Sequence, residues 1–164
     1  MRRAQLLLAA GFFCCAAFSQ ATKPDYSGTW KLNNGKSTHD GPADRVYLMT
    51  VVQSKNSVTV TTKADGVKNL LDGTFPITEK FHVEKLGNNY RSTRAYWEGG
   101  TLVFEVTDRD SKKDTAMVLF YVRESWILSF DGKVLTKTNQ NIEAAKAAGE
   151  KPKRTDLHYV FDKQ

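Results

Sequence analysis

The stretch that decides the fold is Tyr26-Ser27-Gly28-Thr29-Trp30-Lys31-Leu32, which is followed by a series of short strand patterns. A glycine inside a strand indicates that another strand or backbone approaches closely. The wide indole of a tryptophan suits the closed end of a small barrel. The motif Gly28-x-Trp30 therefore predicts a first strand at Gly28–Leu32 and a barrel in which both motif residues are structural.

The rest of the sequence predicts an all-β fold. Short runs rich in Val, Thr, Tyr and Phe alternate with Gly, Asn and Asp, which is typical of a β-sandwich or barrel. Tight turns between successive runs favour an antiparallel meander. The expected strands are Gly28–Leu32, Arg45–Gln53, Ser57–Lys63, Thr74–Thr78, Lys80–Lys85, Tyr90–Trp97, Thr101–Thr107, Ala116–Arg123, Trp126–Ser129, Val134–Thr138 and Asp156–Phe161.

Two turns predict the register of their hairpins. Gly99-Gly100 fits a two-residue primed turn, which needs positive φ. That turn pairs Ala95 with Phe104 on an apolar face and Arg94 with Glu105 as an ion pair on the other face.

The second turn is Phe130-Asp131-Gly132, which fits a type I turn followed by a left-handed glycine. In the expected register, Trp126 and Leu128 share one face with Val134 and Thr136.

One segment departs from the β pattern. Residues Asn141–Gly149 combine a capping Asn, an alanine-rich interior and a terminal Gly, which predicts one short helix before the last strand. We favour a solvated insertion for this helix; the alternative is a lid across one end of the barrel.

The first 21 residues have the features of a signal peptide. Arg2 and Arg3 precede an apolar run from Leu6 to Phe18, and Ser19-Gln20-Ala21 supplies small residues for cleavage. The run is too short for a membrane span. We expect cleavage near Ala21, export to the periplasm or beyond, and one mature domain at 22–164 without a transmembrane segment.

The composition of the mature part narrows the possible partners. Both cysteines, Cys14 and Cys15, lie in the leader, so the exported domain depends on its core and not on disulfides. Without Arg2 and Arg3 the chain has 22 basic and 18 acidic residues, and the two signs are interspersed. This pattern indicates a mixed, solvated surface and argues against nucleic acid as a partner.

Four segments carry a resemblance to a known family. They are 26–33 around the Gly-x-Trp motif, 96–105 around Gly99-Gly100, 126–136 around Asp131-Gly132, and 159–164 at the end. Together they resemble a lipocalin-like (calycin-type) family of exported bacterial proteins of unknown function. The resemblance implies a lipocalin-like barrel, in which a late basic residue, here Arg154 or Lys163, packs over the motif tryptophan. The long C-terminal helix of lipocalins is missing after Phe161.

Catalytic and metal motifs are not found. The chain has neither a Gly-x-Ser-x-Gly elbow nor a phosphate-binding glycine loop. His39, His82 and His158 are far apart in sequence. Residues Asp108–Asp114 lack the glycine and the distal glutamate of a calcium loop, so we interpret them as a solvated turn. We therefore expect no catalytic residues, no metal, no cofactor and no enzymatic activity.

A binding wall is the alternative to plain core packing for the large apolar side chains. Aromatic and methionine side chains with a few polar groups are typical of small-molecule pockets. Two of the strands are apolar on both faces, so the sequence leaves open which face points inward. The candidate ligand-binding residues are Tyr47, Met49, Phe104, Met117, Tyr121 and Trp126.

Two functions follow from this sequence. The leading one is non-enzymatic binding of a small apolar or amphipathic molecule inside the barrel. The alternative is a structural or protein-interaction module of the cell envelope with a filled barrel and a protein partner on its outer surface. Hydrolysis or isomerisation at an unrecognised carboxylate or histidine site is a distant third. An interior cavity of several hundred cubic ångströms would favour binding.

Overall fold

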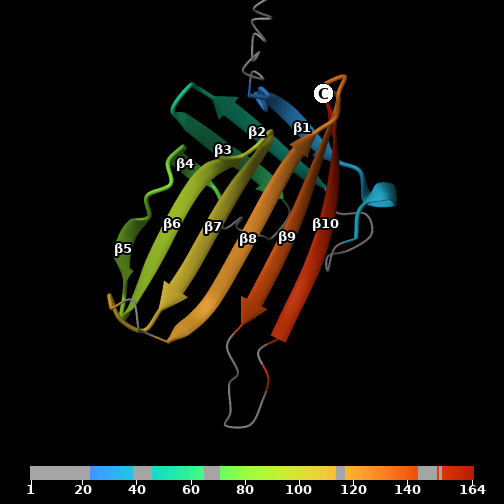
Figure 1. Cartoon of the computed structure of the whole chain (residues 1–164). Helices are drawn as coiled ribbons and strands as arrows, with labels where there is room; N and C mark the ends of the chain where they lie inside the picture. The colour runs from blue at the N-terminus through green and yellow to red at the C-terminus, as the bar shows by residue number, and fades with distance from the viewer. Residues whose placement is uncertain (1–22, 39–45, 65–70, 114–116, 144–150, 152) are drawn as a thin grey trace, which may run out of the picture.

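The computed structural model describes residues 23–38, 46–64, 71–113, 117–143, 151 and 153–164. These residues form one sheet of ten antiparallel strands in the order β4-β3-β2-β1-β10-β9-β8-β7-β6-β5 (Figure 1). The elements are β1 (Gly28–Leu32), the 3-10 turn η1 (Asn34–Lys36), β2 (Tyr47–Gln53), β3 (Ser57–Ala64), β4 (Gly73–Pro76), β5 (His82–Leu86), β6 (Asn89–Glu98), β7 (Thr101–Arg109), β8 (Val118–Leu128), β9 (Val134–Glu143) and β10 (Lys153–Lys163).

The sheet curls into a barrel that is open along one side. Figure 1 shows β5–β10 in front and β1–β4 crossing behind them. Strand β1 pairs with β10, which joins the two ends of the described chain. The edge strands β4 and β5 lie at opposite ends of the sheet order. Just after β4, Ile77 bridges to Ala95 of β6, and the N–H of Thr78 donates to the Ala95 carbonyl at 2.6 Å. The predicted all-β, lipocalin-like meander barrel is confirmed.

Most predicted strands coincide with observed ones, and two predicted segments are parts of one strand. The segments Ala116–Arg123 and Trp126–Ser129 were separated by the polar residues Glu124 and Ser125. In the structure, β8 (Val118–Leu128) includes Val118–Arg123 and Trp126–Leu128 in one strand. Glu124 is buried within the barrel, where the Lys137 ammonium compensates its charge.

The hairpin at Gly99-Gly100 has the predicted register. Ala95 lies opposite Phe104, and Arg94 lies opposite Glu105. Gly99 has φ +57°, as a primed turn requires.

The register predicted for the second hairpin is wrong by one residue. Gly132 has φ +69°, so the turn lies where expected. However, Leu128 pairs with Leu135 and Trp126 pairs with Lys137. The turn closes through a hydrogen bond from the Ser129 N–H to the Val134 carbonyl, which sets this pairing. A slip of one residue exchanges the two faces, so Val134 and Thr136 point away from the Trp126 side.

The predicted helix is wrong at its first three residues. Asn141, Ile142 and Glu143 belong to β9 and pair with both β8 and β10. The backbone N–H and C=O groups of these three residues are satisfied by pairing with the strands on both sides. This pairing outweighs the local capping signal. The rest of the predicted helix, and with it the predicted insertion or lid, lies outside the described residues (144–150).

The Gly28-x-Trp30 motif lies at the end of the barrel where β1 and β10 meet. Trp30 is fully buried, and its indole N–H donates to the Tyr26 carbonyl at 2.9 Å. Lys163 Nζ lies 5.3 Å from the centroid of the Trp30 ring, in the position expected for a late basic residue. Gly28 has φ +142°, and a Cβ there would lie 2.8 Å from Lys163 Cε. The glycine therefore gives Lys163 room beside the tryptophan.

We predict that Trp30→Ala lowers the free energy of unfolding by about 3–5 kcal/mol, the usual cost of removing a large buried aromatic side chain. Denaturant unfolding followed by circular dichroism measures the change. Trp97→Ala is the matched control, because Trp97 is only partly buried and its removal leaves a smaller cavity. An unchanged melting temperature in Trp30→Ala would contradict a structural role.

Candidate functional site

Cross-strand pairing arranges the inner face of β6–β10 in rows. Residues directly opposite one another in neighbouring strands share a face. The row nearest the Gly99-Gly100 turn is Trp97, Leu102, Trp126, Lys137 and Tyr159. The next row is Ala95, Phe104, Glu124, Asn139 and Leu157, and the third is Thr93, Val106, Val122, Asn141 and Thr155. On this inner face, polar side chains therefore accumulate on β8–β10, beside the mainly apolar surface of the neighbouring strands β6 and β7.

Four of the six candidate ligand residues meet at the interior. Met49, Phe104 and Trp126 are fully buried, and the rings of Phe104 and Trp126 lie 4.8 Å apart. Tyr47 packs against this core through Phe161, with ring centroids 5.4 Å apart.

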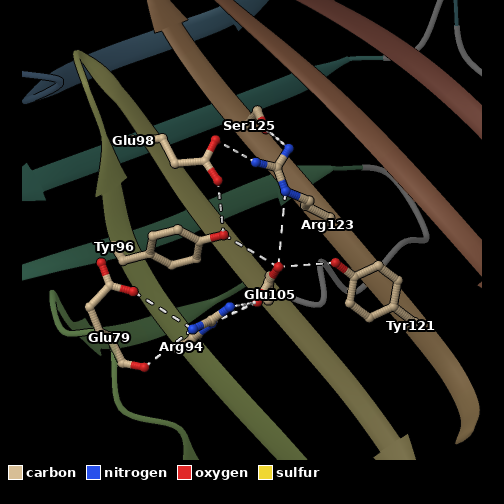
Figure 2. A network of polar contacts seen from close by, with 8 residues as sticks. All are labelled: Glu79, Arg94, Tyr96, Glu98, Glu105, Tyr121, Arg123 and Ser125. Carbon is tan, nitrogen blue, oxygen red and sulfur yellow. Dashed lines mark hydrogen bonds and ion pairs between the residues drawn. The ribbon is translucent and has the colours of Figure 1, made fainter.

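The other two candidates do not join this group. Met117 is 59% exposed and lies just before β8. Tyr121 pairs with Thr107 on the outer face, and its hydroxyl donates to Glu105 Oε1 at 3.0 Å (Figure 2). Because this strand is apolar on both faces, its inward side could not be chosen from sequence. The inward residues are Val122, which is buried, and Phe120, which packs against the core.

A polar cluster explains why β6–β8 carry aromatic residues on their outer face. At its centre, Glu105 is only 8% exposed. Its Oε2 accepts a hydrogen bond from Arg94 Nε at 2.6 Å, and its Oε1 accepts from the hydroxyls of Tyr96 and Tyr121 (Figure 2). The Arg94 guanidinium lies 4.4 Å from the ring centroids of both Phe81 and Tyr96. These contacts tie three strands together from outside the barrel.

We predict that Tyr121 makes stability fall at alkaline pH. Burial, the nearby negative charge of Glu105 and the hydrogen bond to it raise the pKa of Tyr121 to about 12. An unfolded tyrosine has a pKa of about 10. The folded state therefore holds this proton more tightly, and the stabilising contribution is complete below about pH 10 and lost as the pH rises toward 12. Tyr121→Phe should flatten the decline in unfolding free energy between pH 9 and 12; an identical decline would contradict the assignment.

A cleft of about 580 Å³ lies where the barrel is open, between β4 and the pair β5–β6. This volume falls within the range of about 300–1,000 Å³ that is usual for small-molecule sites. Its lining mixes apolar and polar groups, including Phe75, Leu86, Ala95, Thr93, His82, Glu84 and Arg91. Phe75 packs against Phe104, with ring centroids 5.5 Å apart, so the cleft adjoins the aromatic core.

Deeper in the barrel, three polar side chains form a cluster that we call the polar centre: Glu124, Lys137 and Asn139. Glu124 and Lys137 are each 3% exposed. Glu124 Oε1 lies 2.8 Å from Lys137 Nζ and accepts a hydrogen bond from Trp126 Nε1 at 2.5 Å. Glu124 Oε2 accepts from Asn139 Nδ2 at 3.0 Å. The carboxylate is thus held by groups from β8 and β9.

The charge of Lys137 is maintained by its surroundings. Burial alone would lower the pKa of Lys137, but the charge of Glu124 and the hydrogen bond to it raise this pKa above its ordinary value. The ammonium also lies 5.2 Å from the Trp126 ring and 5.5 Å from the Phe161 ring. Sequence reasoning missed this group because isolated Glu and Lys residues in strands are usually exposed. The only signal was spacing: Glu124 is two residues from Trp126, and Lys137 is two residues from Leu135, which places each on the same strand face as a large apolar residue.

A second inward ion pair lies at the cleft. Arg91 Nε and Nη2 donate to the two carboxylate oxygens of Asp108, both at 2.7 Å. Such a two-point pair is geometrically specific and strong. Asp108 was expected in a solvated turn; instead it belongs to β7 and pairs with Arg91 across the strands. The strand simply continues past the predicted end at Thr107.

The described residues contain no group of three His, Cys, Asp or Glu side chains that could hold a metal ion. His82 lines the cleft, whereas the backbone of His158 bridges to Thr38. His39 lies outside the described residues. Within the described part of the chain, we find no helix with the length and hydropathy needed to cross a membrane.

Comparisons with known proteins show the fold. No protein-family model matches the chain, and no curated protein matches it in sequence. A solved structure named REP1-NXSQ fatty acid transporter is 11% identical, with a TM-score of 0.52 over 84% of this chain and 95% of that one. Two secretory abundant heat soluble proteins from Ramazzottius varieornatus are 13% and 12% identical, with TM-scores of 0.56 and 0.54. Each match covers 89% of this chain, and 100% and 99% of the respective relative.

Proposed function

We propose that this protein binds a small amphipathic molecule inside its barrel, without catalysis, and that the ligand enters between β4 and β5. The observation that carries the proposal is the cleft of about 580 Å³ at the open side of the sheet. A barrel with a filled interior and a working outer surface would need no such space. The cleft therefore favours binding over the envelope-module alternative.

The chemistry of the inner face supports an amphipathic ligand. An apolar part can lie against Phe75 and Ala95, which line the cleft next to the aromatic core. Polar atoms can meet Thr93 and Arg91 in the cleft or the polar centre in the row that begins at Ala95. A mostly apolar surface with a few fixed polar groups is the usual composition of a small-molecule site.

The comparisons add support from fold alone. One of the similar structures is named as a fatty acid transporter, so this barrel architecture is compatible with carrying an apolar chain. At 11% identity the inner side chains are not shared in detail, and the ligand has to be inferred from this chain's own residues.

We predict that an eight-carbon amphiphile from the set octanol, octanamide, octanoate and octylammonium binds with one-to-one stoichiometry. Calorimetric titration of the mature protein measures affinity. Thr93→Trp should weaken binding by about tenfold, because Thr93 lines the cleft and an indole there would occupy it. Ser92→Trp is the matched control, since Ser92 neighbours Thr93 but points to the opposite face of β6.

Absence of binding for every member of the set would contradict the proposed function and favour the filled-barrel interaction module. Equal losses of affinity in Thr93→Trp and Ser92→Trp would show that the ligand does not bind in the cleft.

We further propose that the protein acts outside the cytoplasm after removal of residues 1–21. The support is the sequence of the leader and a mature part without cysteine. Mass spectrometry of the exported protein should give a chain beginning at Thr22. A chain retaining Met1 would contradict cleavage.

A further inference from the structure

We propose that the polar centre selects ligands whose head group donates a hydrogen bond and carries no negative charge. This inference rests on the proposed function and names the ligand class of the same barrel interior. It follows from which charges and hydrogen-bonding atoms of the inner face are already satisfied.

The inward-facing cations Lys137 and Arg91 already have counter-ions on this chain. Lys137 is paired with Glu124 at 2.8 Å and lies between the rings of Trp126 and Phe161. Arg91 uses two nitrogens on Asp108. Each of these two inward cations thus already faces a carboxylate. A ligand carboxylate would have to displace Glu124 or Asp108 from its cation. Displacement of Glu124, whose pair with Lys137 is buried, would leave a buried charge unpaired.

Lys80, which lines the cleft after β4, does not change this balance. It is exposed, so solvent screens its charge, and an ion pair there would contribute little. Of the other charged residues that line the cleft, Asp72 and Glu84 oppose an incoming anion, and Arg94 is paired with Glu105.

The side chain of Asn139 supplies a hydrogen-bond acceptor at the polar centre. Its Nδ2 donates to Glu124 Oε2 at 3.0 Å, which fixes the orientation of the amide, because the reverse orientation would place two acceptors together. Its Oδ1 is buried, and no described residue donates a hydrogen bond to it. A buried acceptor of this kind is stabilised by a donor, so the amide oxygen favours a ligand with an O–H or N–H group.

Asn139 does not itself line the cleft. Asn139 shares a row with Ala95, which lines the cleft, and with Phe104 and Glu124 between them. Its neighbours Leu157 and Tyr159 on β10 are partly exposed although they lie on the inner face. To reach Asn139, a ligand would have to open the packing around the buried Phe104 and Glu124, and its chain would then run toward Ala95.

The experiment separates the donor from the charge. Octanol is compared with its isomer heptyl methyl ether, which accepts but cannot donate, and with octanoate. In the wild-type protein, octanol should bind about tenfold more tightly than the ether and also more tightly than octanoate. In Asn139→Leu the difference between octanol and the ether should disappear.

Glu124→Gln tests the charge. Removal of this carboxylate leaves the Lys137 ammonium without its counter-ion, so the affinity for octanoate should rise about tenfold over wild type. In the double variant Glu124→Gln, Lys137→Met both charges are gone, and octanoate binding should return to the wild-type level or below.

The outcomes are distinct. Tighter binding of octanoate or of the ether than of octanol by the wild type would overturn this inference and leave the proposed function standing. Binding of none of the three probes would overturn the proposed function and the inference with it. If Glu124→Gln does not fold, the Asn139→Leu comparison decides, and a retained preference for octanol over the ether would overturn the role of Asn139.

Discussion

The buried ion pair between Glu124 and Lys137 constrains the whole interior of this barrel. Two charges removed from water are costly unless their geometry and their further hydrogen bonds compensate the lost hydration. Trp126 and Asn139 supply those hydrogen bonds to Glu124, while Met49 and the rings of Trp126 and Phe161 surround Lys137. The pair thus fixes side chains from β2, β8, β9 and β10. Since buried pairs are weak sources of net stability, the main effect of this pair is on which side chains meet in the interior.

On the outer face, apolar side chains have to be covered without a core to pack against. Two strands are apolar on both sides, and a barrel wall has only one side that faces the core. Around Glu105, the aromatic bodies of Tyr96 and Tyr121 cover a carboxylate while their hydroxyls donate to it. Arg94 is held against two rings and the same carboxylate. The outward aromatic residues therefore complete a polar network and need no ligand, which is why Tyr121 is unavailable to the interior.

Local turn chemistry made part of this structure predictable. Gly99-Gly100 allows few alternatives, and it correctly placed Ala95 opposite Phe104 and Arg94 opposite Glu105. The same reasoning failed at Asp131-Gly132, where the closing hydrogen bond at Ser129 shifts the register by one residue. The helix signal at Asn141 was overridden by strand neighbours on both sides. The polar centre could not be predicted, because the burial of Glu124 and Lys137 depends on which face of β8 and β9 turns inward.

The fold and the inner side chains carry different information about ligands. A barrel of this shape is shared with a structure named as a fatty acid transporter at 11% identity, so the backbone is common while the lining is not. Affinity for an anion requires a cation whose charge is available, and here Lys137 and Arg91 each face a carboxylate of this chain. A hydrogen-bonding site discriminates most strongly against ligands that leave its buried groups unpaired. In the binding site that we propose, the ligand class is therefore determined by the pairing already present in the barrel and not by the barrel itself.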